Sequence, residues 1–269
     1  MWTRGGDRGG NIATPGHIRT MRPVRTAIAV TVLALTGCST TDATPPAATT
    51  TTTLPGRKAT PEQASALADV LTRNHELGGA DFEVTIEYGV AIIKVVGQVD
   101  FAGHVGSATV SASTEAPPVQ IVFGQNIVVE KIDGLASTLE AANLPPANWM
   151  RRPLRTSTSP LDIVLAIVLS ASATQRDNPV LLMQDGLRFV GTKNIDGVTC
   201  QGLTRGSATY WVGDDGLLHR LEARLVSTKS IADISFTNHG PRKIDEPSQT
   251  DVVDRSEVEG LVAAPEDGQ

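Results

Sequence analysis

The segment Phe82-Glu83-Val84-Thr85-Ile86-Glu87-Tyr88 alternates strictly between apolar and polar side chains. A period of two is typical of a β-strand with one buried face, because successive side chains of a strand point to opposite sides. Val84 and Ile86 are therefore expected on the buried side, with Glu83 and Thr85 facing water. The segment predicts a sheet that is covered on one face only.

The alternation continues through three further segments, and the connections between them are short. The segments, with the apolar residues that share one face, are 91–101 (Ile93, Val95), 105–112 (Val110) and 118–130 (Ile121, Phe123). A short connection such as residues 101–104 favours a hairpin between neighbouring strands. We expect an antiparallel meander of four strands.

A second group of strands is expected after residue 187, where the alternation returns. Asp196-Gly197 marks a turn near the end of the first of these segments. Gly213-Asp214-Asp215-Gly216 stands between two segments and predicts a hairpin. In residues 217–226, Leu221 and Leu225 share a face. The strand segments expected here are 187–198, 210–212, 217–226 and 232–236.

Three helices are expected to accompany the sheet. Thr60-Pro61-Glu62-Gln63 combines a capping residue, a proline for the first helical position and the spacing of a capping box, and Gly78-Gly79 is typical of a helix end. Residues 135–142 predict a short second helix. The third begins at Ser159-Pro160, and its residues 161–169 (LDIVLAIVL) are apolar on nearly every side. Such a helix must be covered on several sides.

The N-terminal region has the three parts of an export signal. Arg22 and Arg25 precede the apolar run 27–35, which is far shorter than the roughly 20 residues of a membrane-spanning helix. Leu35-Thr36-Gly37-Cys38 then resembles a bacterial lipobox, with cleavage expected after Gly37 and lipid attached to Cys38. This predicts export and anchoring to the outer face of the cell membrane. The start codon corresponds to Met1 or to Met21.

Composition divides the rest of the chain into three parts. Residues 38–59 comprise the lipidated cysteine and a tether rich in threonine, alanine and proline, which is expected to be disordered and is either bare or glycosylated. Residues 60–249 form the folded domain, and 250–269 are expected to be a disordered acidic tail. Residues 1–37 are the signal peptide.

Charge and cysteine content exclude some classes of protein. Residues 1–37 hold five of the 23 basic residues and one of the 29 acidic residues, so the mature chain keeps 18 and 28 and carries a net charge of −10. Nucleic-acid binding is disfavoured, because it requires a basic face. If Cys38 carries lipid, Cys200 has no disulfide partner, and it is expected to be a small strand residue.

Catalytic and metal-binding motifs are lacking in the sequence. There is no G-x-S-x-G nucleophile elbow, no P-loop and no G-x-G-x-x-G, and the histidines are not at zinc-ligand spacing. Asp214-Asp215 lacks the further oxygen ligands of a calcium loop. We therefore expect a protein that is not an enzyme and needs neither cofactor nor metal.

Four segments in this order resemble one family. They are Leu35–Cys38, Val190–Val198 (VGTKNIDGV), Tyr210–Leu217 (YWVGDDGL) and Ile234–Gly240 (ISFTNHG), and the resemblance spans roughly residues 60 to 248. Together they are similar to the mycobacterial lipoproteins LppX, LprA, LprF and LprG, whose fold resembles the carriers LolA and LolB. The resemblance implies an α+β fold with a single curved antiparallel sheet, a half-barrel, and helices on its concave face that enclose an apolar cavity.

The resemblance also implies a function, namely binding acylated lipids or glycolipids in the cavity and carrying or presenting them in the cell envelope. Few aromatic residues, 4% of the chain, leave room for such a ligand, and a monomer is expected. The predicted cavity residues are Val84, Ile86, Ile93, Val95, Val110, Ile121, Phe123, Ile163, Ile167, Leu221 and Leu225.

Two further expectations concern partners. Trp149, Arg151, Arg152 and Arg155 form a basic amphipathic cluster that either contacts anionic headgroups or is a solvated loop. The alternative to a lipid carrier is an envelope lipoprotein that binds a protein partner, such as a transporter, sensor or assembly factor, through the same sheet. An esterase is a more distant third.

Overall fold

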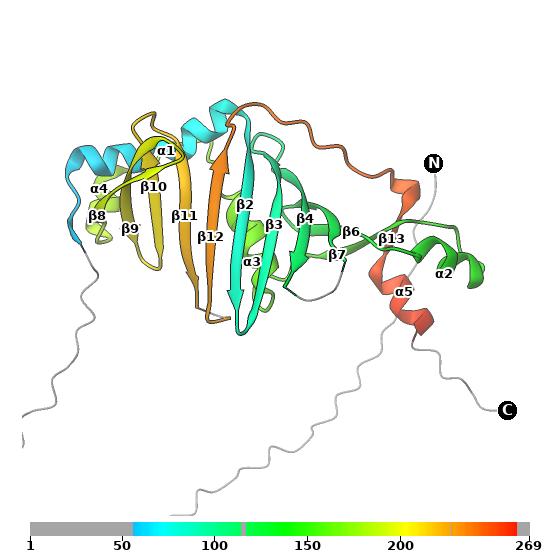
Figure 1. Cartoon of the computed structure of the whole chain (residues 1–269). Helices are drawn as coiled ribbons and strands as arrows, with labels where there is room; N and C mark the ends of the chain where they lie inside the picture. Colours follow the sequence, from blue (N-terminus) through cyan, green and yellow to red (C-terminus); the bar gives the residue numbers. More distant parts are fainter. Residues whose placement is uncertain (1–55, 114–116, 227, 263–269) are drawn as a thin grey trace, which may run out of the picture. The chain divides into compact units, whose positions relative to one another are not determined.

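The computed structural model describes residues 56–113, 117–226 and 228–262 (Figure 1). The signal peptide, Cys38 and its lipid, and most of the tether lie outside the described residues. The helices are α1 Pro61–Leu77, α2 Leu135–Ala141, α3 Pro160–Leu169, α4 Pro179–Gln184 and α5 Arg255–Val262, with a 3-10 turn η1 at Gln249–Asp251.

The strands of the described residues belong to one sheet. They are β1 Arg57–Lys58, β2 Gly79–Tyr88, β3 Ala91–Asp100, β4 Val105–Ala112, β5 Val119–Gly124, β6 Ile127–Lys131, β7 Trp149–Pro153, β8 Arg188–Ile195, β9 Val198–Arg205, β10 Ala208–Gly213, β11 Leu218–Leu225, β12 Ser230–Thr237 and β13 Val252–Asp254.

The sheet is open and almost wholly antiparallel. Its strand order is β1-β8-β9-β10-β11-β12-β2-β3-β4-β5-β6-β7-β13, and only β7 and β13 pair in parallel. The N-terminal meander and the C-terminal group of strands meet where β12 pairs with β2. The fold is therefore α+β with a single large sheet that does not close on itself, as expected in outline from the sequence.

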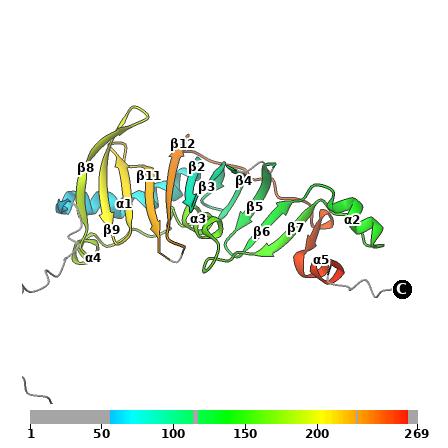
Figure 2. The same ribbon diagram turned by 60° about the horizontal axis from the view of Figure 1, so that its bottom comes forward.

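One face of the sheet is buried, as the alternation predicted. Val84 pairs with Val95, and Val95 pairs with Val110, so the three side chains share a face. Val84 and Val95 are fully buried. Glu83 and Lys94 lie on the opposite face and form an ion pair of 2.8 Å between half-exposed side chains. Helix α3 lies on the buried face and contacts β2, β3 and β12 (Figure 2).

The start of α1 confirms the predicted cap. The backbone N–H of Gln63 donates to Thr60 Oγ1 at 3.3 Å, and the backbone N–H of Thr60 donates to Gln63 Oε1 at 3.0 Å, which completes a capping box. The helix ends at Gly78, whose φ of 90° lies in the left-handed region that glycine adopts without strain. Local sequence signals alone determine both ends of this helix.

The two ends of the domain differ from the predicted boundaries. Residues 57–58, assigned to the tether, form β1 and pair with β8. Residues 250–262, expected to be a disordered tail, contain β13 and α5, while 263–269 lie outside the described residues. The tail prediction was wrong for 250–262 because contacts distant in sequence order it: β13 pairs with β7, and Arg151 bonds Asp254 through two hydrogen bonds of 2.6 and 2.8 Å.

The middle of the chain also holds elements that its sequence did not predict. The segment 118–130 is two strands, β5 and β6, because Gly124 and the residues after it turn the chain. Residues 149–153, treated as a cluster or loop, form the ordered strand β7. Asn178-Pro179 starts the short helix α4, whose Asn178 side chain accepts a hydrogen bond from the Val180 backbone.

Candidate functional site

The eleven predicted cavity residues lie together on the α3 side of the sheet. Seven of them are buried members of the main hydrophobic core: Val84, Ile86, Val95, Ile121, Phe123, Leu221 and Leu225. The other four are partly buried residues packed against that core: Ile93, Val110, Ile163 and Ile167. Alternation therefore assigned the nine strand residues among them to the correct face, and Ile163 and Ile167 belong to α3. Membership of the core is not the same as lining a cavity.

The structure does not show the enclosed apolar cavity that was expected between the sheet and α3. The inner side of α3 presents Val164, Leu165 and Val168, which have no exposed surface. Phenylalanines fill much of the remaining space, and Phe82 meets Phe123 edge to face with ring centroids 6.1 Å apart. Four of the five phenylalanines, Phe82, Phe101, Phe123 and Phe236, are buried in this core, so the low aromatic content of the chain did not predict how the core is filled.

An open apolar groove lies along the other side of α3, between this helix and β10 and β11. Its volume is about 310 Å³. Three predicted residues line it, Ile163, Ile167 and Leu221. The remaining lining residues are Leu71, Thr156, Ala166, Ser170, Ala171, Tyr210 and Leu218. The groove lies at the low end of the size range of small-molecule sites, roughly 300 to 1,000 Å³.

Sequence reasoning missed Leu71, Tyr210 and Leu218 as lining residues. Leu71 lies on the apolar face of α1, and Tyr210 pairs with Leu221 across β10 and β11. The helical spacing of apolar residues around Leu71 and the strand alternation around Tyr210 could have placed both residues on the core side. Burial raises the pKa of the Tyr210 phenol, with the nearby Asp177 carboxylate acting in the same direction and Arg205 against it. Tyr210 therefore presents a neutral hydroxyl at physiological pH.

An ion-pair network fixes the first turn of α3 to the sheet. Arg152 Nη1 and Nη2 donate to the Asp162 carboxylate at 2.7 and 3.0 Å, and Arg152 Nε donates to Glu130 Oε1 at 2.7 Å. The Arg155 backbone N–H adds a 2.7 Å bond to Asp162. Burial opposes the charge of Arg152, but the hydrogen bonds to Asp162 and Glu130 outweigh it and raise the pKa of the guanidinium.

The position of Arg152 in this network differs from its predicted role in headgroup contact. Arg152 is only 8% exposed and faces the interior, because β7 places it opposite Val128 on the buried side of the sheet. Arg151 points to the other face and is paired with Asp254. Trp149 is half-buried on β7 beside Val252, and Arg155 is exposed. Arg151, Arg152 and Arg155 still border one concavity of about 330 Å³, and Trp149 is not among its lining residues.

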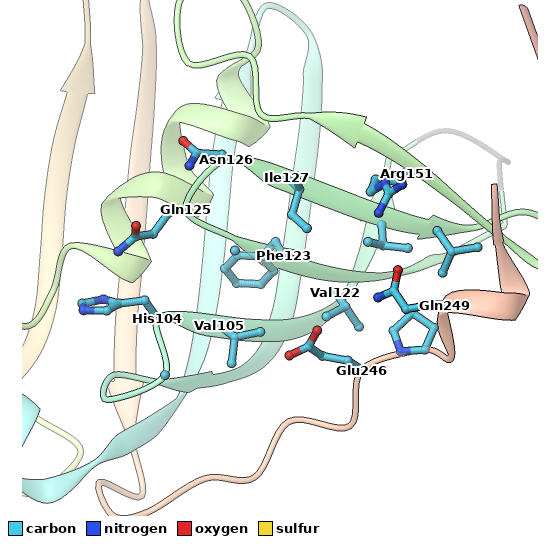
Figure 3. Close-up of a pocket in the computed structure, with 15 residues that line it drawn as sticks. His104, Val105, Val122, Phe123, Gln125, Asn126, Ile127, Arg151, Glu246 and Gln249 are labelled. Atoms are coloured by element: carbon cyan, nitrogen blue, oxygen red, sulfur yellow. The ribbon is translucent and has the colours of Figure 1, made fainter. Parts of the chain in front are cut away.

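A second concavity of about 480 Å³ lies on the sheet face that points away from α3 (Figure 3). Val122 pairs with Val129, and both side chains face it because Ile121 and Phe123 on either side of Val122 take the α3 side. The C-terminal segment contributes Glu246, Pro247, Gln249 and Val252 to the opposite wall. We call this concavity the strap pocket, and residues 246–252 the strap.

Sequence reasoning missed the strap pocket altogether. Its floor lies on the face of the meander that was expected to meet solvent, and its strap begins just before the residues that were expected to be disordered. The signals in the sequence were four apolar residues that share this face, Val105, Val122, Ile127 and Val129.

Membrane-spanning helices and metal-ligand clusters are both lacking in the part of the chain that the structure describes. None of its helices combines the length and apolarity needed to cross a bilayer. Within the same residues, no group of three or more histidine, cysteine, aspartate or glutamate side chains is placed to hold a metal ion. Cys200 is a free, buried strand residue of β9, and burial raises the pKa of its thiol to about 11, with Asp215, Asp214 and Asp196 adding to the effect.

Comparisons with known proteins give weak similarities. No family model and no curated protein matches the chain. Among solved structures, an uncharacterized conserved protein from Thermus thermophilus is 11% identical, with a TM-score of 0.38, over 71% of this chain and 97% of the other. MucB, in a complex with MucA(peri), is 11% identical, with a TM-score of 0.33, over 70% of this chain and 59% of the other. At these values the similarities define neither a family nor a function.

Proposed function

We propose that this protein is an exported, membrane-anchored lipoprotein that binds an acyl chain of a lipid or glycolipid in the groove between α3 and β10–β11. It acts as a carrier or presenter of the lipid and has no catalytic activity. The lipobox Leu35–Cys38 supports the anchor and the location on the outer face of the membrane. The tether keeps the domain within reach of the bilayer.

The observation that carries the proposal is the chemistry of the groove. Thr156, Ser170 and Tyr210 contribute the hydroxyls of its lining, and none of the described residues that line it is charged. A hydrocarbon chain needs this kind of surface, and an anionic or sugar head would remain in solvent. The apolar and aromatic lining residues are Leu71, Ile163, Ala166, Ile167, Ala171, Tyr210, Leu218 and Leu221.

Burial of methylenes is sufficient to hold a chain there. Each methylene moved out of water contributes about 0.8 kcal/mol, so about eight of them contribute roughly 6 kcal/mol before the entropic cost of binding. A groove of about 310 Å³ holds only part of a long chain. Binding is therefore expected to be reversible, as a carrier requires.

The test is to purify the full-length protein, extract it with organic solvent and identify co-purified lipids by mass spectrometry. In parallel, palmitate binding is titrated against the wild type and against Ala166→Phe, which places a ring in the groove. We expect lipid in the extract and at least about tenfold weaker palmitate binding by the variant.

Ala141→Phe is the matched control, because Ala141 is an exposed alanine on α2, remote from the groove lining. It should bind palmitate as the wild type does. An extract without lipid, together with equal palmitate binding by both variants, would rule the carrier function out.

A protein partner is the second candidate, and exposed apolar residues on α4 favour it. Val180, Leu181 and Met183 are 60%, 55% and 40% exposed, which is unusual for neighbouring residues of a helix in water. In this case purified protein yields no lipid, and Leu181→Asp abolishes capture of one specific envelope polypeptide while Ala166→Phe leaves that capture intact.

A further inference from the structure

The strap pocket has an apolar floor that three strands build together. Val105 lies on β4, Val122 on β5, and Ile127 and Val129 on β6. Val122 and Val129 are each only 7% exposed although they lie on the sheet face opposite to α3. The strap covers them instead, and Figure 3 shows Glu246 and Gln249 projecting from it beside the strands that carry Val105 and Val122.

The strap is fixed in place rather than resting loosely on the sheet. The backbone and side-chain N–H groups of Asn148 both donate to Asp251 Oδ1, at 2.8 and 2.9 Å. β13 then pairs with β7 over three residues. The pocket is therefore formed before any ligand arrives, and binding does not have to order its wall.

Gly124 leaves part of the pocket empty. It pairs with Val105, and a methyl group added to it would come no closer than 3.9 Å to any other group, its neighbours being the His104 carbonyl and the Ile127 side chain. No positive φ is required at this position. A larger side chain at Gly124 would thus fill the pocket without straining the backbone.

The described charged groups around the pocket leave one negative charge without a partner. Arg151 is the only lysine or arginine among the lining residues that the structure describes, and Asp254 neutralises it through two hydrogen bonds. Glu246 has no ion-pair partner among the described residues. The polar groups that complete the rim are the amides of Gln125, Asn126 and Gln249 and the imidazole of His104.

We propose that the strap pocket is a second ligand site, separate from the groove, which binds a small molecule with an apolar body and a cationic nitrogen. The apolar body lies on Val105, Val122, Ile127 and Val129, and the nitrogen is placed against the Glu246 carboxylate. The volume of about 480 Å³ suits a small molecule. A carboxylate or phosphate head is disfavoured, because it would lie beside Glu246 with no free cation to meet it among the described lining residues.

The test uses two probes that share a six-carbon chain and differ in charge, hexylammonium and hexanoate. Each is titrated into the full-length protein at pH 8, above the range in which imidazoles usually titrate, while the methyl signals of Val105, Val122 and Val129 are followed by NMR. We expect saturable shifts with hexylammonium and binding of hexanoate that is at least about fivefold weaker, as an exposed ion pair allows.

Two variants distinguish the pocket from general adsorption. Gly124→Val should abolish the shifts, and Glu246→Gln should remove the preference for hexylammonium while both probes still bind. Glu87→Gln is the matched control, because Glu87 is an exposed carboxylate on β2, on the same face of the sheet as the strap pocket. It should change neither the shifts nor the preference for hexylammonium.

Equal binding of the two probes by the wild type would overturn the proposal, as would shifts confined to the groove residues Ile163 and Leu221. Should Gly124→Val fail to fold, Glu246→Gln alone decides, and an unchanged preference for hexylammonium in that variant refutes the site. Palmitate binding in the groove is independent of every one of these outcomes.

Discussion

Arg152 and Asp162 illustrate how a single residue pair positions an element. Asp162 has no exposed surface, and its two oxygens accept three hydrogen bonds, two from Arg152 and one from the Arg155 backbone. In the sequence, Asp162 is the one charged residue of an otherwise apolar helix. Because nothing local indicated its partner, Arg152 was assigned to a headgroup surface rather than to the interior.

Breaking this pair should be costly. Asp162→Asn leaves Arg152 buried next to Glu130 alone, and removing one member of a buried pair typically costs about 3 to 5 kcal/mol of stability. Denaturant unfolding followed by circular dichroism measures the loss. Asp69→Asn, in the half-exposed pair of Asp69 and Arg176, should cost less than about 1 kcal/mol. Equal losses in the two variants would contradict the assigned role of Arg152.

His239 should make stability dependent on pH. Burial and the neighbouring His219 lower its pKa below the ordinary 6.5, although its 3.2 Å contact with the Leu218 carbonyl and the Asp215 carboxylate oppose this, and Arg242 adds to the lowering. The unfolded chain therefore takes up a proton first as the pH falls. Stability is complete above about pH 6.5 and declines on acidification toward the lower folded pKa.

Unfolding free energies measured at pH 7 and pH 5 should show this decline, and His239→Gln should reduce it. The Asp215 carboxylate adds a separate loss at more acidic pH. Its pKa is lowered by the Leu217 backbone N–H and by His219, which outweigh the effect of burial, so its contribution disappears only as the pH falls through and below 3.8.

At the scale of the elements, the packing between β4 and β5 requires a residue without a side chain at Gly106. Gly106 pairs with Phe123, whose ring covers it, so that an added methyl would overlap the ring. Gly106→Ala must displace the ring from the core and should cost about 1 to 3 kcal/mol. Gly124→Ala, one strand across with no close neighbour, should change stability by less than about 0.5 kcal/mol. Thermal unfolding of the two variants compares them directly.

The helices and strands also show which local sequence patterns are sufficient to predict an element. The capping box at Thr60 and Gln63 defined the start of α1, and Ser159-Pro160 defined the start of α3, because these signals act within one turn of helix. Alternation placed the nine predicted strand residues on the correct face of the sheet. It could not tell a filled core from a hollow one, since that depends on which distant side chains meet, as Phe82 and Phe123 do.

At the level of the whole domain, the C-terminal segment is part of the fold, although its acidic composition predicted disorder. β13 has only three residues and α5 only eight, so their order depends on distant partners on β7 and at Asn148. Val253 and Val258 pack against a small second core that includes Leu135, Leu139 and Ala147. This end of the domain therefore folds as one unit of α2, β7, β13 and α5.

Removal of residues 249–269 tests that unit. Without β13, the edge of β7 exposes unpaired backbone groups, and Arg151 loses Asp254. We expect a lower unfolding temperature and concentration-dependent association through the exposed edge, with palmitate binding retained in the groove because no described residue beyond 221 lines it. Calorimetry, size-exclusion chromatography and the palmitate titration measure these effects. If the shortened chain stays monomeric and equally stable, the C-terminal segment is an accessory rather than part of the sheet.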